Sequence, residues 1–192
     1  MSEQSTDNRP RLDQLLVDRG LFATRSRARD AIQRGTVKVN GKAVTKPGQN
    51  VLRTAELSVD DPASAYVSRG ALKLIAALDH FNIDVKGLNA LDIGASTGGF
   101  TQVLLERGAS HVIAIDVGHD QLHPTLCNDP RVTNKEGVNA RALDFIHLDG
   151  RDIGCVVSDV SFISLKLALP PALAFAQKDA ICALLVKPQF EA

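Results

Sequence analysis

Three ionisable side chains stand beside strongly apolar segments, and their chemical types suit proton transfer. Asp159 follows the apolar run at 155–157, and Lys187 follows the one at 181–186. Lys73 lies in a segment whose leucines recur at helical spacing. A lysine can take the proton of a weakly acidic hydroxyl if a nearby positive charge favours its neutral form, and a carboxylate can orient that lysine. Asp159 and Lys187 are therefore candidate site residues, whereas a lone lysine at the edge of an apolar helical stripe, as Lys73 is, is usually a surface cation.

A glycine-rich turn at 94–99 is the second functional element. It joins an expected strand to an expected helix, and the following strand at 111–115 ends on Asp116. Glycines let a backbone approach a ligand closely, and a carboxylate at that strand end suits ribose hydroxyls. The loop reads G-x-x-x-G-G, and the dinucleotide fingerprint would require glycine where residue 96 is serine. The loop therefore favours a nucleoside cofactor without pyrophosphate, S-adenosylmethionine, over a nicotinamide dinucleotide.

The hydrophobic pattern predicts the scaffold that must position these residues. Apolar strands alternate with helical segments, including a crossover helix at 162–178 that is interrupted at its prolines. Repeated strand–helix–strand units imply a parallel sheet, and ligands bind beyond the carboxyl ends of its strands. We therefore expect an α/β fold with a doubly wound, Rossmann-like sheet. Its strands are expected at 88–93, 111–115, 131–134, 155–157 and 181–186.

The first 59 residues differ from the rest in charge and in pattern. They carry eleven Lys and Arg against six Asp and Glu, whereas residues 60–192 carry eleven against sixteen. Two short helices, the second capped by Thr24, should precede a hairpin that turns at Asn40-Gly41. This is the pattern of a small α+β domain. Its positive charge suggests a polyanionic partner.

Several motifs of this basic module stand at a defined spacing: Arg11-Leu12-Asp13, Ser26-Arg27-Ala28-Arg29, Ile32, Gly35, Val37-Lys38-Val39-Asn40-Gly41 and Pro47. Together they resemble the α-L RNA-binding domain of a small-subunit ribosomal protein, pseudouridine synthases and tyrosyl-tRNA synthetases. Guanidinium groups at helical spacing suit the phosphates of a structured RNA. The expected RNA-binding residues are Arg11, Arg25, Arg27, Arg29, Arg34 and Lys38. A generic protein-interaction role is the alternative for this module.

The remaining chain carries four further motifs: SRGALKL at 68–74, LDIGASTGGFT at 91–101, SDVSFIS at 158–164 and VKPQFE at 186–191. In this order, after the basic module, they resemble the TlyA (haemolysin A) family over residues 11–191. Members of that family are ribosomal RNA cytidine 2′-O-methyltransferases with an FtsJ-like catalytic domain. The resemblance implies methyl transfer from S-adenosylmethionine to a ribose 2′-hydroxyl, with ribosomal RNA or ribosomal subunits as the partner.

The resemblance also assigns site residues. Lys73, Asp159 and Lys187 match the first three members of a Lys-Asp-Lys-Glu tetrad. The fourth member is a glutamate on a later strand, and Glu191 belongs to a different motif, so the C-terminal part of the catalytic domain is expected to be missing. The expected cofactor-binding residues are Ser68, Arg69, Gly70, Asp92, Gly94, Ala95, Ser96, Thr97, Gly98, Gly99, Phe100, Asp116, Glu136 and Asn139.

These observations predict an RNA-binding domain at 1–59, a linker at 60–65 and a methyltransferase domain at 66–192. The apolar runs are far shorter than the roughly 20 residues of a membrane span, and the polar N-terminus lacks a signal-peptide pattern. The three cysteines are scattered without metal-ligand spacing, which is typical of reduced thiols. We therefore expect a cytoplasmic protein that has neither a metal site nor a membrane partner.

Three other functions compete with this interpretation. A non-catalytic RNA-binding or ribosome-assembly protein could use the same fold, and methyl transfer to RNA discriminates the two. A membrane-active haemolysin conflicts with the missing membrane span and with the short, polar helix at 25–34. A nicotinamide-dependent oxidoreductase conflicts with the loop at 94–99.

Overall fold

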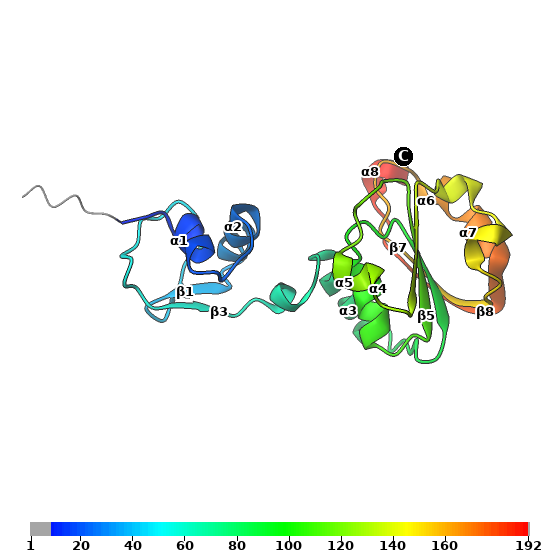
Figure 1. Ribbon diagram of the computed structural model, residues 1–192, viewed down its shortest axis with the longest axis horizontal. Helices are drawn as coiled ribbons and strands as arrows, with labels where there is room; N and C mark the ends of the chain where they lie inside the picture. Colours follow the sequence, from blue (N-terminus) through cyan, green and yellow to red (C-terminus); the bar gives the residue numbers. More distant parts are fainter. Residues whose placement is uncertain (1–8, 192) are drawn as a thin grey trace, which may run out of the picture. The chain divides into compact units, whose positions relative to one another are not determined.

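The chain folds into two units, with the boundary after Pro62 (Figure 1). Each unit has hydrophobic cores of its own. The structure, a computed structural model, describes residues 9–191. One core lies in the first unit, and two lie in the second unit. Each unit therefore has the apolar interior that an independent domain needs.

The first unit packs two helices with a three-stranded antiparallel sheet. Its elements are α1 (Leu12–Asp18), α2 (Arg25–Gln33), β1 (Val37–Val39), β2 (Lys42–Ala43) and β3 (Leu57–Val59), in the sheet order β2-β1-β3. The Thr24 side chain accepts a hydrogen bond from the Arg27 backbone N–H, which confirms the predicted cap of α2. Asn40 and Gly41 both have positive φ, as a tight hairpin turn requires. Strand β3 was not predicted, because no Asn-Gly turn of the kind that marks the hairpin of β1 and β2 adjoins it.

The second unit is built on a five-stranded parallel sheet. Its strands are β4 (Asn89–Ile93), β5 (His111–Asp116), β6 (Val132–Glu136), β7 (Ile153–Ser158) and β8 (Ala176–Leu184), in the order β6-β5-β4-β7-β8. Its helices are α3 (Gly70–His80), α4 (Gly99–Glu106), α5 (Pro124–Cys127), α6 (Leu165–Ala168), α7 (Pro170–Phe175) and α8 (Pro188–Glu191). The short 3₁₀ segments are η1 (Pro62–Ala65), η2 (Ala140–Ala142) and η3 (Phe145–Leu148). The expected parallel sheet is confirmed.

Helical segments cover both faces of this sheet, as Figure 1 shows. On one face, α3 and α4 bury their apolar side chains against Ala90, Val112 and Val157. On the other face, η3 and α7 pack on strand residues such as Ile93 and Ile113. Because successive side chains of a strand point to opposite faces, a strand buried on both sides has a continuous apolar sequence. The continuous apolar sequences of the strands therefore explain why helices cover both faces of the sheet.

The crossover between β7 and β8 differs from the expected single helix at 162–178. It contains two short helices, α6 and α7, that meet at Leu169 and Pro170. Proline lacks a backbone N–H and restricts the residue before it, so the helix cannot continue through this point. Strand β8 then begins at Ala176, five residues before the expected start at 181.

The segment expected to be a linker, 60–65, has local structure of its own. The Asp60 backbone N–H donates to the Thr36 carbonyl, and the Asp61 carboxylate binds Arg34. Residues 62–65 form η1, and the Ala65 carbonyl accepts a hydrogen bond from the Gln102 side chain. The proline and small residues that indicated a linker also suit a 3₁₀ turn.

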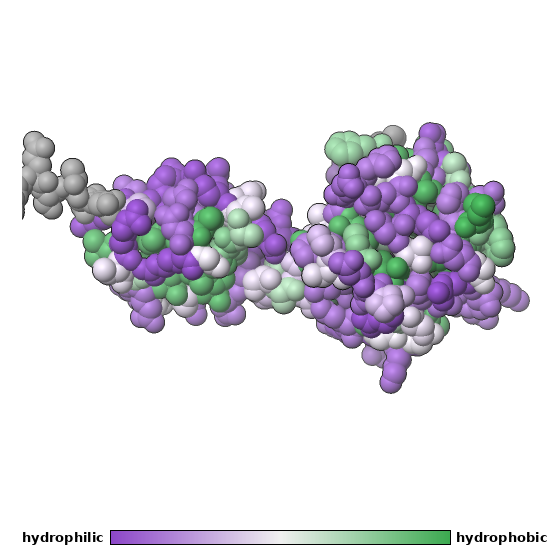
Figure 2. Space-filling model, in the orientation of Figure 1, coloured by the Kyte–Doolittle hydropathy of each residue, from purple (hydrophilic) through white to green (hydrophobic). Residues whose placement is uncertain are grey.

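The surface of both units is largely polar where Figure 2 shows it, with smaller apolar areas between the hydrophilic side chains. Among the described residues, none of the helices combines the length and the hydropathy that crossing a membrane requires.

Candidate active site

The carboxyl ends of the parallel strands bring the candidate residues together. Asp116 is the last residue of β5, and Asp159 comes directly after β7. Lys187 lies three residues beyond the end of β8, and the Leu185 backbone N–H still donates to the Ser158 carbonyl at 2.9 Å. Because parallel strands end at one edge of the sheet, residues far apart in the sequence meet there.

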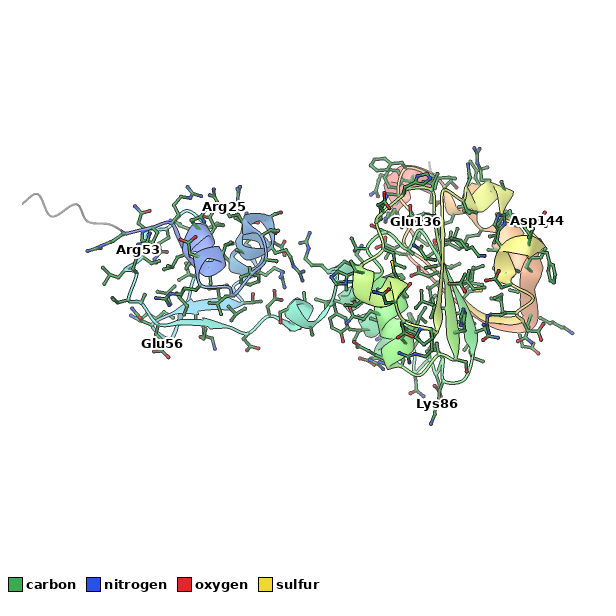
Figure 3. All side chains as sticks on the ribbon, in the orientation of Figure 1. Arg25, Arg53, Glu56, Lys86, Glu136 and Asp144 are labelled. Carbon is green, nitrogen blue, oxygen red and sulfur yellow. The ribbon has the colours of Figure 1, made fainter. Side chains whose placement is uncertain are left out.

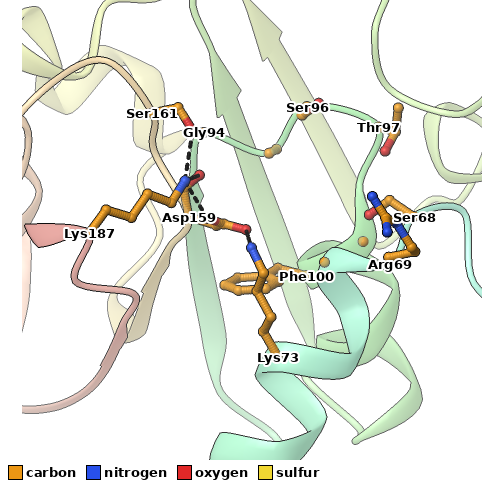
Figure 4. Close-up of a pocket in the computed structure, with 13 residues that line it drawn as sticks. Ser68, Arg69, Lys73, Gly94, Ser96, Thr97, Phe100, Asp159, Ser161 and Lys187 are labelled. Atoms are coloured by element: carbon orange, nitrogen blue, oxygen red, sulfur yellow. Dashed lines mark hydrogen bonds and ion pairs between the residues drawn. The ribbon is translucent and has the colours of Figure 1, made fainter. Parts of the chain in front are cut away.

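Lys73, Asp159 and Lys187 form a continuous row of charges (Figure 4). The Lys73 Nζ atom donates to Asp159 Oδ2 at 2.8 Å. The Lys187 Nζ atom forms an ion pair with Asp159 Oδ1 at 2.7 Å and donates to the Ser161 hydroxyl at 2.7 Å. One carboxylate therefore orients two amines, as the sequence predicted for Asp159.

The two lysines differ in exposure. The side chain of Lys187 is 17% exposed and that of Asp159 is 19% exposed, whereas that of Lys73 is 48% exposed. The Lys187 amine also donates to the Asp159 backbone carbonyl at 3.2 Å, so protein atoms surround most of it. Of the two amines, that of Lys187 is the more enclosed and has the larger number of hydrogen-bond partners.

A cavity of about 570 Å³ lies beside this row and takes in the motif at 68–73. Its wall is shared by the N-terminal end of α3, the glycine-rich loop and the row of charges (Figure 4). The lining residues include Ser68, Arg69, Gly70, Lys73, Gly94, Ala95, Ser96, Thr97, Gly99, Phe100, Asp159, Ser161 and Lys187. Nine of the expected cofactor-binding residues thus lie next to the three expected catalytic residues.

Glycines give the loop between β4 and α4 its shape. Gly94 has φ +80°, and a Cβ atom there would lie 2.8 Å from Val160 Cγ1. Gly98 has φ +95°, and a Cβ atom there would lie 2.3 Å from Leu126 Cδ1. Both positions combine a left-handed backbone with close packing, so only glycine fits them without movement of the neighbours.

A second cavity, of about 520 Å³, lies on the Asp116 side of the loop. The Asp116 carboxylate accepts hydrogen bonds from the backbone N–H groups of Ser96 and Gly118, both at 2.8 Å. Each oxygen keeps a further lone pair for a ligand hydroxyl. The other lining residues include apolar Ile115, Val117, Val138 and Phe162, and polar Asn139 and Arg141. A carboxylate beside apolar walls fits the ribose and base of a nucleoside, so these residues suit S-adenosylmethionine.

Three expected cofactor-binding residues, Asp92, Gly98 and Glu136, line neither of these cavities. Asp92 is 1% exposed, and its Oδ2 accepts a 2.7 Å hydrogen bond from the Thr101 hydroxyl, which ties β4 to α4. Burial raises the pKa of Asp92 to about 7. The Glu136 carboxylate accepts backbone N–H groups from residues 120, 121 and 122, which lower its pKa to about 2. Both side chains support the loops that surround the site.

In the first unit, a buried carboxylate organises two of the expected RNA-binding arginines. The Asp13 side chain is fully buried and accepts hydrogen bonds from Arg11 and Arg25. The hydrogen bond from Arg11 is the main cause that lowers the pKa of Asp13. Both arginine side chains remain half exposed, and Figure 3 shows Arg25, the first residue of α2, at the surface.

The other expected RNA-binding residues fall into two groups. Arg27, Arg29 and Lys38 are exposed, the first two on α2 and the third on β1. Arg34 instead binds Asp61 through both terminal nitrogens, at 2.7 and 2.8 Å, and Asp30 through Nε. Its guanidinium group therefore fastens α2 to the segment that follows β3.

Sequence reasoning missed Ser161 and the contacts of Glu191. The Ser161 hydroxyl binds the Lys187 amine, and Glu191 binds Ser164 at the start of α6. The only available signal was that these residues belong to the two motifs that carry Asp159 and Lys187. Contacts between such motifs need the tertiary structure. Among the residues that the structure describes, no three His, Cys, Asp or Glu side chains gather in a way that could hold a metal ion.

Two family models match this chain. The model of the FtsJ-like methyltransferase matches residues 66–192, and that of the S4 domain matches residues 10–57. The second match covers the module in which α-L motifs were identified.

Curated relatives match nearly the whole chain. The 16S/23S rRNA (cytidine-2′-O)-methyltransferase TlyA of Mycobacterium tuberculosis is 50% identical over 184 residues, which are 95% of this chain and 68% of that protein. Hemolysin A of Brachyspira hyodysenteriae is 41% identical over 95% of this chain and 75% of that protein. A solved structure from Streptococcus thermophilus, provisionally named a hemolysin, is 41% identical with a TM-score of 0.70, over 97% of this chain and 69% of that one. The chain thus spans about two thirds to three quarters of the length of these relatives.

Proposed function

This chain belongs to the TlyA family of FtsJ-like methyltransferases, and we propose that it transfers a methyl group from S-adenosylmethionine to the 2′-hydroxyl of a cytidine in ribosomal RNA. One observation of the structure supports this most. The row Lys73–Asp159–Lys187 borders a cavity that the glycine-rich loop also lines. A lysine that could accept the proton of the ribose hydroxyl therefore lies beside a cavity that could hold the methyl donor.

Each residue of the row has a proposed role. Lys187, in its neutral form, accepts the proton of the ribose 2′-hydroxyl, because that hydroxyl is a poor nucleophile until the proton leaves. Asp159 orients the Lys187 amine through a 2.7 Å ion pair and anchors Lys73 on its other oxygen. Lys73 supplies a second positive charge at the same carboxylate. The reaction then depends mainly on the alignment of the two substrates.

The cofactor is assigned to the two cavities on either side of the loop at 94–99. When bound, S-adenosylmethionine supplies an electrophilic methyl group on its sulfonium. Asp116 and Asn139 would hold the nucleoside, and residues 68–70 together with the loop would hold the remainder. The loop offers backbone N–H groups but has no pyrophosphate fingerprint.

Incubation with radiolabelled S-adenosylmethionine and isolated ribosomal subunits tests the proposed reaction directly. We expect label in ribosomal RNA, in a nucleotide that resists alkaline hydrolysis because its 2′-oxygen is methylated. The result that would favour the alternative, a non-catalytic RNA-binding or assembly protein, is tight binding to subunits without transfer of label. A ribosomal substrate would place the protein in the cytoplasm.

Asp116→Ala should weaken the binding of S-adenosylmethionine about ten- to a hundredfold, because a lost charge-assisted hydrogen bond typically costs about 1.5–3 kcal/mol. Isothermal titration calorimetry measures the affinity. The matched control is Asp120→Asn, which alters an exposed carboxylate of the following loop and should leave the affinity unchanged. Wild-type affinity of the Asp116→Ala protein would remove Asp116 from the cofactor site, and a preference for NAD would overturn the cofactor assignment.

Replacing Arg27 and Arg29 together by alanine should weaken RNA binding without changing its sequence preference. Each lost phosphate contact should lower the slope of log affinity against log salt by about one, because fewer counterions are released on binding. Filter binding at several salt concentrations gives that slope. Lys46→Ala, on the loop that follows β2, serves as the control for a change in charge alone. An unchanged slope in the double variant would show that α2 is not the contact surface.

A further inference from the structure

Two segments that follow neighbouring strands meet at the site, 159–165 after β7 and 185–191 after β8. From their contacts we propose that Glu191 is a positioning residue, whose bonds to the start of α6 hold the Lys187 amine against Asp159. The link to methyl transfer rests on the proposed function. The contacts of Glu191 with Ser164 and Leu165 are present whatever reaction the protein catalyses.

The Glu191 carboxylate spans the gap between the two segments with short hydrogen bonds. Its Oε2 accepts from the Ser164 hydroxyl at 2.6 Å, and its Oε1 accepts from the Leu165 backbone N–H at 2.7 Å. Hydrogen bonds to an ionised carboxylate are about twice as strong as neutral ones. The hydroxyl of Ser164 and the N–H of Leu165 lower the pKa of Glu191, so the carboxylate stays ionised at neutral pH.

Along the chain, Lys187 lies between the Glu191 contact and a backbone hydrogen bond made by Leu185. On its N-terminal side, the Leu185 N–H donates to the Ser158 carbonyl at 2.9 Å, which extends the pairing of β8 with β7. On its C-terminal side, the Phe190 N–H donates to the Lys187 carbonyl at 2.9 Å. The short helix α8 then ends on Glu191. The backbone of Lys187 is thus attached to the neighbouring segment on both sides.

Loss of the Glu191 carboxylate would leave the segment at 185–191 attached through the Leu185 hydrogen bond, the contact of the Phe190 ring with Phe162, and the bonds of the Lys187 amine itself. The Glu191 contact is the one among these that fixes the C-terminal end of α8 by hydrogen bonds to the start of α6. A helix of four residues is not stable by itself, so α8 needs outside contacts to keep its shape. The Lys187 side chain has four flexible methylene groups, and movement of its backbone would spread the amine over several positions. A displacement of about 1 Å at a reacting group can lower a rate about a hundredfold.

The structure separates this role from that of a reacting carboxylate. Both Glu191 oxygens already accept donors from Ser164 and Leu165. A glutamine side chain can keep both contacts, with its carbonyl oxygen on the Leu165 N–H and its amide on the Ser164 oxygen. Glu191→Gln should therefore retain function if the contacts matter, and should fail if the charge itself takes part in the reaction.

The experiment compares Glu191→Ala, Glu191→Gln and Ser164→Ala in the full chain, with Gln189→Ala as the matched control in the same segment. Gln189 is exposed and makes no hydrogen bond among the described residues. One measurement is kcat and KM of methyl transfer. The other is the rate at which an amine-acetylating reagent modifies Lys187 as a function of pH, followed by peptide mass spectrometry. The second measurement does not depend on methyl transfer.

We expect Glu191→Ala to lower kcat about ten- to a hundredfold with little change in KM, and to speed the acetylation of Lys187. Glu191→Gln and Gln189→Ala should resemble the wild type. Glu191→Ala combined with Ser164→Ala should lose less than the sum of the single losses, because both residues share one contact. Wild-type acetylation and kcat in Glu191→Ala would overturn the proposal, and so would a Glu191→Gln protein as impaired as Glu191→Ala. Faster acetylation in a protein without any methyl transfer would support the positioning role and refute the proposed function.

Discussion

Lys187→Ala should lower kcat of methyl transfer by about a hundred- to ten-thousandfold, the usual contribution of a general base. The affinities for S-adenosylmethionine and RNA should stay close to those of the wild type, because a base acts on the transition state and contributes little to ground-state binding. The structure supports this expectation, since the Lys187 amine is held by Asp159 and Ser161 at the edge of the cavity. Single-turnover transfer of labelled methyl groups, together with calorimetry, separates the two effects.

Two further variants make this experiment decisive. Lys166→Ala removes an exposed lysine of α6 and should leave kcat unchanged, which controls for the loss of one positive charge near the site. Lys187→Arg keeps the charge but cannot act as a base near neutral pH, so it should be as slow as Lys187→Ala. Near-normal turnover by Lys187→Arg would show that positive charge, and not proton removal, is the contribution of this position.

Asp92→Asn should make the protein more stable than the wild type above pH 7, with the difference disappearing near pH 4. Burial raises the pKa of Asp92 from an ordinary value of 3.8 to about 7 in the folded state. Between these values the folded protein holds a proton that the unfolded chain has released, so the wild type loses stability as the pH rises through this window. The full loss is up to about 4 kcal/mol, at about 1.4 kcal/mol for each pH unit. Asparagine is neutral throughout and avoids this loss.

Urea titrations of both proteins at several pH values between 4 and 8 measure the effect. Asp152→Asn, at an exposed position, is the control and should run parallel to the wild type. Stability curves of Asp92→Asn and wild type that are parallel from pH 4 to pH 8 would mean that Asp92 ionises normally in the folded protein. Its second oxygen would then need a bound water or cation, because Oδ1 has no hydrogen-bond partner among the described residues.

The sequence by itself was sufficient to predict the helices, strands and turns that depend on adjacent residues. The apolar runs at 111–115 and 155–157 gave β5 and β7, because a strand buried on both faces must be apolar throughout. Thr24 predicted the start of α2, and Asn40-Gly41 predicted the hairpin, because caps and tight turns depend on a few adjacent residues. The order of the strands along the chain then implied that Asp159 and Lys187 lie at one edge of the sheet, which the structure shows.

The tertiary structure alone decided how polar side chains pair across the fold. Asp92 and Asp116 both belong to the segment expected to hold the cofactor, yet Asp92 turns into the interior towards Thr101 while Asp116 lines a cavity. Arg34 and Arg29 are both on or next to α2, but only Arg34 meets the buried carboxylate of Asp61. Such pairings join residues that are distant in sequence, as with Glu191 and Ser164. Local patterns set which residues are polar, and the packing of the elements sets which of them satisfy one another and which remain available for chemistry.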